Sequence, residues 1–203
     1  FDGKGVLTGN PVRASFKSLP EKAHTPPLRL LCFGWSQGSR ILSEGLIKAL
    51  PTLPDEAALT IVHQTGPAQF DHVAAAYRAA GRKAEVTAFI DNMWDAFAAA
   101  DLVLCRAGAT TLAELTVAGK AAVLVPLRSA AEDHQTWNAK AMVASGAALM
   151  VAETELDTLG AVISDLVARP ERLRSLEQGA RALGRPDAAA RVADLLVPMV
   201  RAA

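Results

Sequence analysis

Short apolar runs of strand length alternate six times along the chain with stretches in which apolar residues recur at helical spacing. The apolar runs cover Leu28–Phe33, 60–63, 84–87, Leu102–Cys105, 121–125 and 147–151. Strands separated by helices pair in parallel through right-handed crossovers, and the helices cover both faces of the sheet. The sequence therefore predicts an α/β fold, and 203 residues with 51% hydrophobic content suffice for one such domain with a full core.

The fourth run is followed by a glycine turn that leads directly into a helix. Residues 106–108 (Arg-Ala-Gly) form the predicted turn, and the helix is expected from 109 to 118. Free backbone N–H groups and the positive end of the helix dipole meet at such a junction, which suits an anion. Glu114 lies one turn into the helix, where its carboxylate can accept hydrogen bonds from two sugar hydroxyls. A phosphate beside a ribose indicates a nucleotide. The alternative is an ordinary strand–helix junction in which Glu114 is a solvated helix acid.

A second strand, glycine loop and helix begin at Leu28–Phe33, where the sequence continues as Gly-Trp-Ser-Gln-Gly over 34–38. The loop is neither a GxGxxG motif nor a Walker sequence. Its glycines still allow a ligand to approach the backbone, and Ser36 offers a hydroxyl donor, although plain turn chemistry explains the glycines equally well. Phe89 and Ile90 follow the third run, at the sheet edge where α/β proteins bind ligands, and they serve either as a base platform or as core.

Charge and cysteine usage restrict the kinds of partner. Lys+Arg and Asp+Glu both number 21, so no overall field attracts nucleic acid or an anionic membrane, and binding must come from a local site. Cys32 and Cys105 lie in apolar runs without a CxxC or histidine cluster, which favours buried free thiols of a reducing compartment.

No apolar run approaches the roughly 20 residues needed to span a bilayer, so we expect a soluble protein. The chain begins at Phe1, and we expect a fragment or a processed product.

Six sequence blocks together resemble the C-terminal half of the MurG family. They are GNPVR at 9–13, GWSQGSRIL at 34–42, IVHQTG at 61–66, AEVTAFIDNM at 84–93, CRAGATTLAEL at 105–115 and EDHQTWNA at 132–139. Members of that family move N-acetylglucosamine (GlcNAc) from UDP onto lipid I to make lipid II. Their GT-B architecture has two Rossmann-like domains, and the second binds the sugar nucleotide. The resemblance implies that this chain is one Rossmann-like GT-B domain with UDP-GlcNAc as its ligand.

The resemblance also implies a role for individual residues. Arg13, Ser36 and Gln37 would contact the diphosphate of the donor. Phe89 would cover the uracil ring, and the main chain of Ile90 would pair with the base. The run Ala109, Thr110, Thr111, Leu112, Ala113 and Glu114 would hold phosphate and ribose, and His134 and Gln135 would read GlcNAc hydroxyls. Two positions depart from the family, which usually has Gly at Trp35 and His near Ser129.

From the same resemblance we expect three segments: a lead-in or linker over 1–27, the UDP-sugar-binding domain over 28–185, and a closing helix over 186–203. The lipid I acceptor, the catalytic base and the membrane-facing patch would belong to a missing N-terminal domain, toward which the closing helix would pack. The complete enzyme would be cytoplasmic and peripheral on the inner face of the plasma membrane, without metal or other cofactor. Two alternatives stay open: the donor subunit of another GT-B transferase that uses a UDP-sugar, and a non-catalytic nucleotide-sugar binding module.

Overall fold

The structure is a computed structural model that describes residues 5–35, 37–128 and 133–201. Within this part, six parallel strands form one sheet in the order β3-β2-β1-β4-β5-β6. The strands are β1 (Leu28–Phe33), β2 (Leu59–Gln64), β3 (Glu85–Thr87), β4 (Leu102–Cys105), β5 (Ala122–Leu124) and β6 (Leu149–Met150). The predicted α/β fold with a parallel sheet is thus confirmed. The strand order reverses between β1 and β4, which is where open α/β sheets form a crevice at their carboxyl edge.

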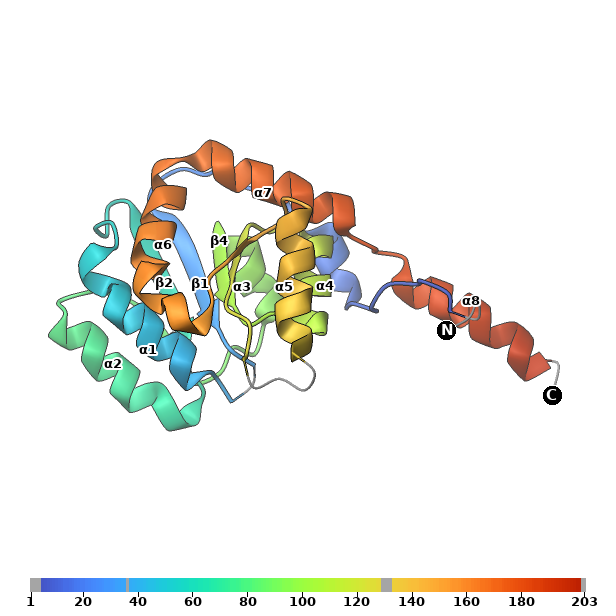
Figure 1. Cartoon of the computed structure of the whole chain (residues 1–203), viewed down its shortest axis with the longest axis horizontal. Helices are drawn as coiled ribbons and strands as arrows, with labels where there is room; N and C mark the ends of the chain where they lie inside the picture. Colours follow the sequence, from blue (N-terminus) through green and yellow to red (C-terminus); the bar gives the residue numbers. More distant parts are fainter. Residues whose placement is uncertain (1–4, 36, 129–132, 202–203) are drawn as a thin grey trace.

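Helices cover both faces of the sheet, as predicted (Figure 1). One face carries α1 (Arg40–Ala49), α2 (Phe70–Ala79) and α6 (Leu159–Ala168), and the other carries α3 (Met93–Ala99), α4 (Ala109–Ala118) and α5 (His134–Ala144). Helix α7 (Pro170–Leu183) contributes residues to the cores of both faces. Helix α8 (Ala188–Arg201) projects away from the body, and the start of the chain runs beside it (Figure 1).

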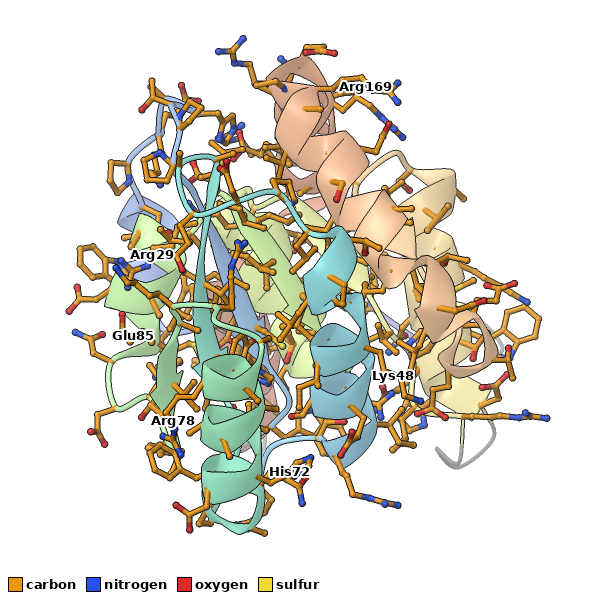
Figure 2. The ribbon with its side chains drawn as sticks, turned by 90° about the vertical axis from the view of Figure 1, so that its left-hand side faces the viewer. Arg29, Lys48, His72, Arg78, Glu85 and Arg169 are labelled. Carbon is orange, nitrogen blue, oxygen red and sulfur yellow. The ribbon has the colours of Figure 1, made fainter. Side chains whose placement is uncertain are left out.

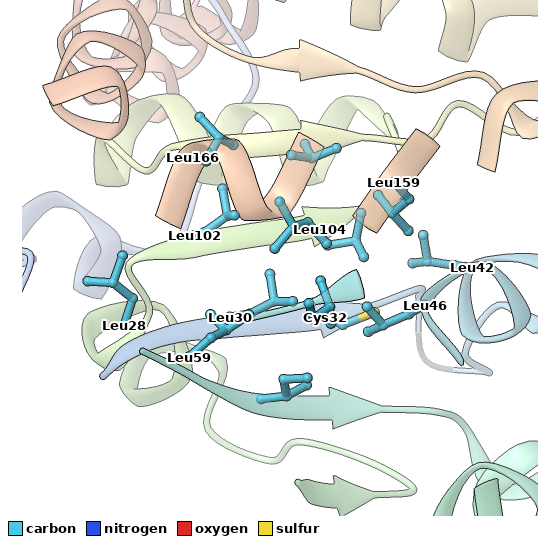
Figure 3. Packing of buried hydrophobic residues seen from close by; sticks show 14 of the residues in the cluster. Leu28, Leu30, Cys32, Leu42, Leu46, Leu59, Leu102, Leu104, Leu159 and Leu166 are labelled. Atoms are coloured by element: carbon cyan, nitrogen blue, oxygen red, sulfur yellow. The ribbon is translucent and has the colours of Figure 1, made fainter. Parts of the chain in front are cut away.

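Alternate residues of the central strands fill two separate cores, because successive side chains of a strand point to opposite faces. Leu30 and Cys32 of β1 lie with Leu104 of β4 against α1 and α6 (Figure 3). Leu31 and Phe33 of β1 point to the other core, which α3, α4 and α5 cover. Both faces of β1 are therefore buried, which explains why its sequence reads as a continuous apolar run rather than an alternating one.

Several charged and polar side chains lie on the outer surfaces. Lys48 on α1 and His72 and Arg78 on α2 are exposed on the side of the helices that faces away from the sheet (Figure 2). At the β3 edge, Nη2 of Arg29 lies 2.6 Å from Oε2 of Glu85, and this pair spans the neighbouring strands β1, β2 and β3 (Figure 2).

The lead-in is attached to the body of the domain through an aromatic cluster and a buried ionic cluster. Phe16, within the 3-10 helix Ala14–Ser18, is 1% exposed and packs edge-on against Phe97 of α3 with ring centroids 5.2 Å apart. Nearer β1, the wholly buried Asp101 carboxylate accepts hydrogen bonds from Lys22 and from Nδ1 of His24, the latter at 2.9 Å. Both contacts make residues 13–24 a packed part of the domain surface.

Four elements have ends that periodicity does not specify. Helix α5 begins at His134 after the cap residue Asp133, and residues 131 and 132 lie outside the described residues. The 3-10 segment Glu153–Thr158 directly precedes α6, and a 3-10 turn, Pro67–Gln69, precedes α2. Strand β6 has two residues where 147–151 was predicted, because it pairs with only one neighbour, the short strand β5. Periodicity alone does not distinguish a 3-10 turn from the first turn of an α-helix.

Candidate functional site

The amino end of α4 lies at the reversal point of the sheet, beside the Trp35 indole. Gly108 occupies the cap position, and among the described residues no side chain caps the helix. The first helical bond runs from Leu112 N–H to the Gly108 carbonyl at 3.0 Å, which leaves the preceding three N–H groups outside the helical ladder. Asn138 of α5 donates from Nδ2 to the Ala107 carbonyl at 3.0 Å and fixes the loop. A helix end of this kind suits an anion.

Residues from distant parts of the sequence gather around a hollow of about 200 Å³ beside this helix end. Five of the predicted site residues line it, and they come from the lead-in, from the loop after β3 and from α4: Arg13, Phe89, Ile90, Thr111 and Glu114. The wall also contains residues that the sequence analysis assigned no contact in the site, including Phe33, Gln64, Asp91 and Met93. The hollow thus combines apolar and aromatic groups with one carboxylate on α4 and one arginine.

Glu114 is not the solvated acid of the alternative interpretation. Its side chain is 13% exposed, and Nη2 of Arg13 donates to its Oε1 at 3.2 Å. Burial raises the pKa of the Glu114 carboxyl above its ordinary value, and the hydrogen bond and charge of Arg13 oppose that rise. The Arg13 guanidinium also lies over the Phe16 ring, with its central carbon 5.1 Å from the ring centroid. The lead-in therefore places the positively charged Arg13 side chain beside the Glu114 carboxylate.

The loop after β3 presents an aromatic ring and unused main-chain groups. Phe89 is 54% exposed and its carbonyl accepts from the Thr87 hydroxyl at 2.7 Å. Gln64 of β2 donates from Nε2 to the Ala88 carbonyl at 3.2 Å. Within the described chain, no hydrogen bond engages the N–H or the carbonyl of Ile90. A base edge could pair with these main-chain groups while its ring lies near Phe89.

The glycine loop after β1 is packed backbone to backbone against the loop after β2. Gly38 has φ +73°, and a Cβ placed on it would lie 1.7 Å from the Thr65 carbonyl oxygen. Gly66 has φ +75°, and its Cβ would lie 2.0 Å from the Gln37 carbonyl oxygen. Both positions require glycine for close approach as well as for the turn. The sequence analysis considered ligand approach or a plain turn for the glycines of the 34–38 loop, and it assigned Gly66 no role. Gln37 itself is exposed, and Ser36 lies outside the described residues.

Arg106 is a structural component of the site that the sequence analysis missed. It is 5% exposed, and its Nε donates to the Ser39 hydroxyl at 3.1 Å. Its Nη1 donates to the Val125 carbonyl at 3.1 Å and lies 2.7 Å from Oε1 of Glu153. One guanidinium thus joins the loops that follow β1, β5 and β6. An arginine directly after a fully apolar strand is the signal that could have indicated this role, since a buried cation requires partners.

The remaining predicted residues lie apart from the hollow. Ala109 and Thr110 are exposed at the start of α4, whereas Leu112 and Ala113 line a different hollow of about 400 Å³. Gln135 is fully buried, with its Oε1 accepting from Leu127 N–H at 3.0 Å. Its Nε2 has no partner within the described residues. His134 is the first residue of α5, and Ser129 lies outside the described residues.

Cys32 and Cys105 are buried free thiols, as predicted, and burial raises the pKa of both. Across the described ranges, none of the helices is both long and apolar enough to cross a bilayer.

Comparisons with known proteins agree with the fold and identify the family. The model of the glycosyltransferase family 28 C-terminal domain matches residues 29–192. The chain is 45% identical over 202 residues to the UDP-N-acetylglucosamine–N-acetylmuramyl-(pentapeptide) pyrophosphoryl-undecaprenol N-acetylglucosamine transferase of Myxococcus xanthus, covering 97% of this chain and 53% of that protein. It is 44% identical over 207 residues to the protein of the same name from Nitratidesulfovibrio vulgaris, covering 98% and 56%.

Among solved structures, MurG of Acinetobacter baumannii is similar with a TM-score of 0.79 and 37% identity, covering 89% of this chain and 54% of that chain. The chain thus spans about half the length of the curated relatives it matches.

Proposed function

Because the chain belongs to the family of glycosyltransferase family 28 C-terminal domains, we propose that it is the donor-binding half of an N-acetylglucosaminyltransferase. The complete enzyme would add GlcNAc from UDP-GlcNAc to lipid I and form lipid II for peptidoglycan biosynthesis. The relatives at 44–45% identity carry the name of such a transferase, and this chain spans about half their length, so the reaction belongs to the complete enzyme.

The observation that carries the proposal is the hollow beside α4, where Arg13, Phe89, Ile90 and Glu114 meet at an uncapped helix end. A uridine fits this set chemically. Its base would lie on Phe89 and pair with the Ile90 main chain, while Glu114 would accept the two ribose hydroxyls. The diphosphate would then extend toward the α4 N–H groups and the 34–38 loop, including Ser36 and Gln37, with Arg13 close by.

The sugar would lie near the start of α5, where His134 and Gln135 could read its hydroxyls. Transfer requires the acceptor hydroxyl to attack the anomeric carbon as UDP leaves with additional negative charge on its diphosphate. Fixed N–H dipoles at a helix end stabilise such charge without reorganisation. Arg13 would add a positive charge. We assign this chain the binding of the donor and the stabilisation of the leaving group, and we assign it no catalytic base.

We further propose the division of the chain into a lead-in (1–27), the donor domain (28–185) and a closing helix (186–203) that packs toward an N-terminal acceptor domain. Leu195, Leu196 and Val197 of α8 are 41%, 54% and 46% exposed, which supports a partner surface for that helix. That acceptor domain would bind lipid I and supply the membrane contact, so the complete enzyme would act in the cytoplasm at the inner face of the plasma membrane.

Calorimetric titration of the chain with UDP, UDP-GlcNAc and UDP-GalNAc tests the proposal. Binding of UDP-GlcNAc in preference to UDP-GalNAc is expected. A preference for a different UDP-sugar would favour the donor subunit of another GT-B transferase. Tight binding without any turnover, even after a separately expressed N-terminal half is added, would favour a non-catalytic binding module. Absence of binding to all three ligands would refute the proposal.

A further inference from the structure

We propose that Trp35 determines ligand specificity at this site by lowering the affinity for nucleoside diphosphates while leaving the affinity for nucleosides unchanged. The indole would do so by occupying the space that a diphosphate needs at the amino end of α4. This inference rests on the proposed function, because it takes the hollow beside α4 to be a uridine site.

The backbone directs the Trp35 side chain to an unusual place. Its φ is +33°, in the left-handed region that side-chain-bearing residues rarely adopt. Ahead of it, a Cβ on Gly34 would lie 2.5 Å from the Ser39 Cβ, so the loop is closed tightly onto the start of α1. Rotation of the indole about its side-chain bonds is therefore the simplest way for the ring to leave this place.

The indole lies against the cap residue of α4. A Cβ on Gly108 would be 3.0 Å from Trp35 Nε1 and 3.6 Å from two further atoms of the ring. Gly108 directly precedes the three N–H groups outside the helical ladder. A phosphate that hydrogen-bonds to those groups must approach the same end of the helix, because donor and acceptor atoms have to come within about 3 Å of each other. The ring and a phosphate thus compete for one space.

The ring also closes one side of the hollow, which it lines together with Phe89 and Glu114. The hollow measures about 200 Å³. Pockets for small ligands typically have roughly 300–1,000 Å³, so the space with the ring in place suits a nucleoside better than a nucleotide sugar. Trp35 is 53% exposed, and within the described residues its N–H donates no hydrogen bond. A ligand can therefore displace the ring at the cost of its packing contacts alone.

The indole therefore lowers the affinity for UDP but not the affinity for uridine. Uridine would occupy the region of Phe89, Ile90 and Glu114 without moving the ring, whereas UDP would have to rotate the ring away before its phosphates reach α4. Removing the ring should raise the affinity for UDP and leave that for uridine unchanged. An indole that instead donated its N–H to a phosphate would give the opposite result for UDP.

The test compares the affinities for uridine and UDP in the unchanged protein, in W35G, in W35F and in W137A. Trp137 is the matched control, since it is 67% exposed on α5 and does not line the hollow. We expect W35G to bind UDP about fivefold more tightly or better, with uridine affinity within about twofold. W35F keeps a bulky ring without the N–H and should stay close to the unchanged protein, as should W137A.

Unchanged or weakened UDP binding in W35G would overturn the inference, and so would a loss of UDP affinity in W35F, because that loss identifies the N–H as a phosphate donor. Uridine binding in each variant reports that its fold is intact. If neither the unchanged protein nor W35G binds UDP, the proposed function fails together with the inference. If the unchanged protein binds UDP, and the ratio of its UDP affinity to its uridine affinity is the same in W35G, only the proposed role of Trp35 is refuted.

Discussion

Nη2 of Arg13 lies 3.2 Å from Oε1 of Glu114, so the lead-in and helix α4 share one ion pair at the wall of the candidate site. The carboxylate proposed to accept ribose hydroxyls is already engaged in the free domain. A carboxylate has room for several donors, so Arg13 and a ribose can be accommodated together. The pair holds the Glu114 side chain in one orientation before a ligand arrives, which reduces the ordering cost of binding.

Glu114→Ala should lower the affinity for UDP by roughly tenfold or more, because hydrogen bonds to a charged group contribute about 1.5–3 kcal/mol each. The fold should survive, since the side chain lies at the surface of the hollow and not in either core. Calorimetry of UDP binding measures the effect. Glu85→Ala is a suitable control, because Glu85 also pairs with an arginine but lies at the β3 edge. Equal UDP affinity in Glu114→Ala and the unchanged protein would rule out a ribose contact.

The base should be selected as uracil. We expect UDP-GlcNAc to bind more tightly than ADP-GlcNAc or GDP-GlcNAc, because the main-chain N–H and carbonyl of Ile90 can match only one arrangement of donors and acceptors on a base edge. Competition titrations against UDP give the three affinities under one set of conditions. Comparable affinities for all three nucleotides would show that the base is held by stacking near Phe89 without pairing.

The stability of the domain should decline in mild acid because of His63. Its ring lies between the Ser43 hydroxyl and the Tyr77 hydroxyl, each 3.1 Å from a ring nitrogen, and burial lowers the His63 pKa to about 4. The unfolded chain, with an ordinary histidine pKa near 6.5, therefore takes up this proton first. The contribution of neutral His63 to the free energy of unfolding is fully present above about pH 6.5 and declines as the pH falls toward 4. The total loss over this range is roughly 3 kcal/mol.

Urea unfolding at several pH values, repeated with His63→Gln, isolates this contribution from that of the other acidic groups. The variant should lose less stability between pH 6.5 and 4 than the unchanged protein. His72→Gln serves as the control for the substitution itself, because His72 is exposed on α2, pairs with Glu44 at the surface and belongs to neither core. Identical slopes for His63→Gln and the unchanged protein would contradict the assignment to His63.

The chain alone should transfer no sugar. We propose that the acceptor site and the base belong to an N-terminal domain, so the donor domain can bind UDP-GlcNAc without a nucleophile beside it. The assay follows lipid II formation from UDP-GlcNAc and a soluble lipid I analogue, first with this chain and then with a separately expressed N-terminal half added. Turnover by the chain alone would contradict the assignment of the acceptor site and the base to an N-terminal domain.

Sequence periodicity predicted the strands and their parallel pairing because β1, β4 and β5 are buried on both faces and read as uninterrupted apolar runs. It also predicted the helix that opens at Ala109 and the place of Glu114 one turn into it, since both features are local. The short 3-10 turns and the ends of β6 were not predictable, because they depend on neighbours far away in the sequence.

The site contains contacts that no local pattern specifies. The reach of Arg106 to Glu153, 47 positions later in the chain, and the approach of Gly38 to Thr65 arise only when separate loops meet at one sheet edge. The same is true of Arg13 beside Glu114. The resemblance implied a contact for Arg13 with the diphosphate, but its ion pair with the carboxylate became visible only in three dimensions.

The attachment of the lead-in determines where this domain could be exchanged between related enzymes. A chimaera joined at the first residue of β1 would omit Lys22 and His24 and leave the buried Asp101 carboxylate without two of its partners. It would also lack Phe16 against Phe97, and Arg13 at the mouth of the hollow. A junction placed before Arg13 would transplant the domain together with its own ionic and aromatic supports. The natural unit of recombination is therefore longer than the sheet and its helices.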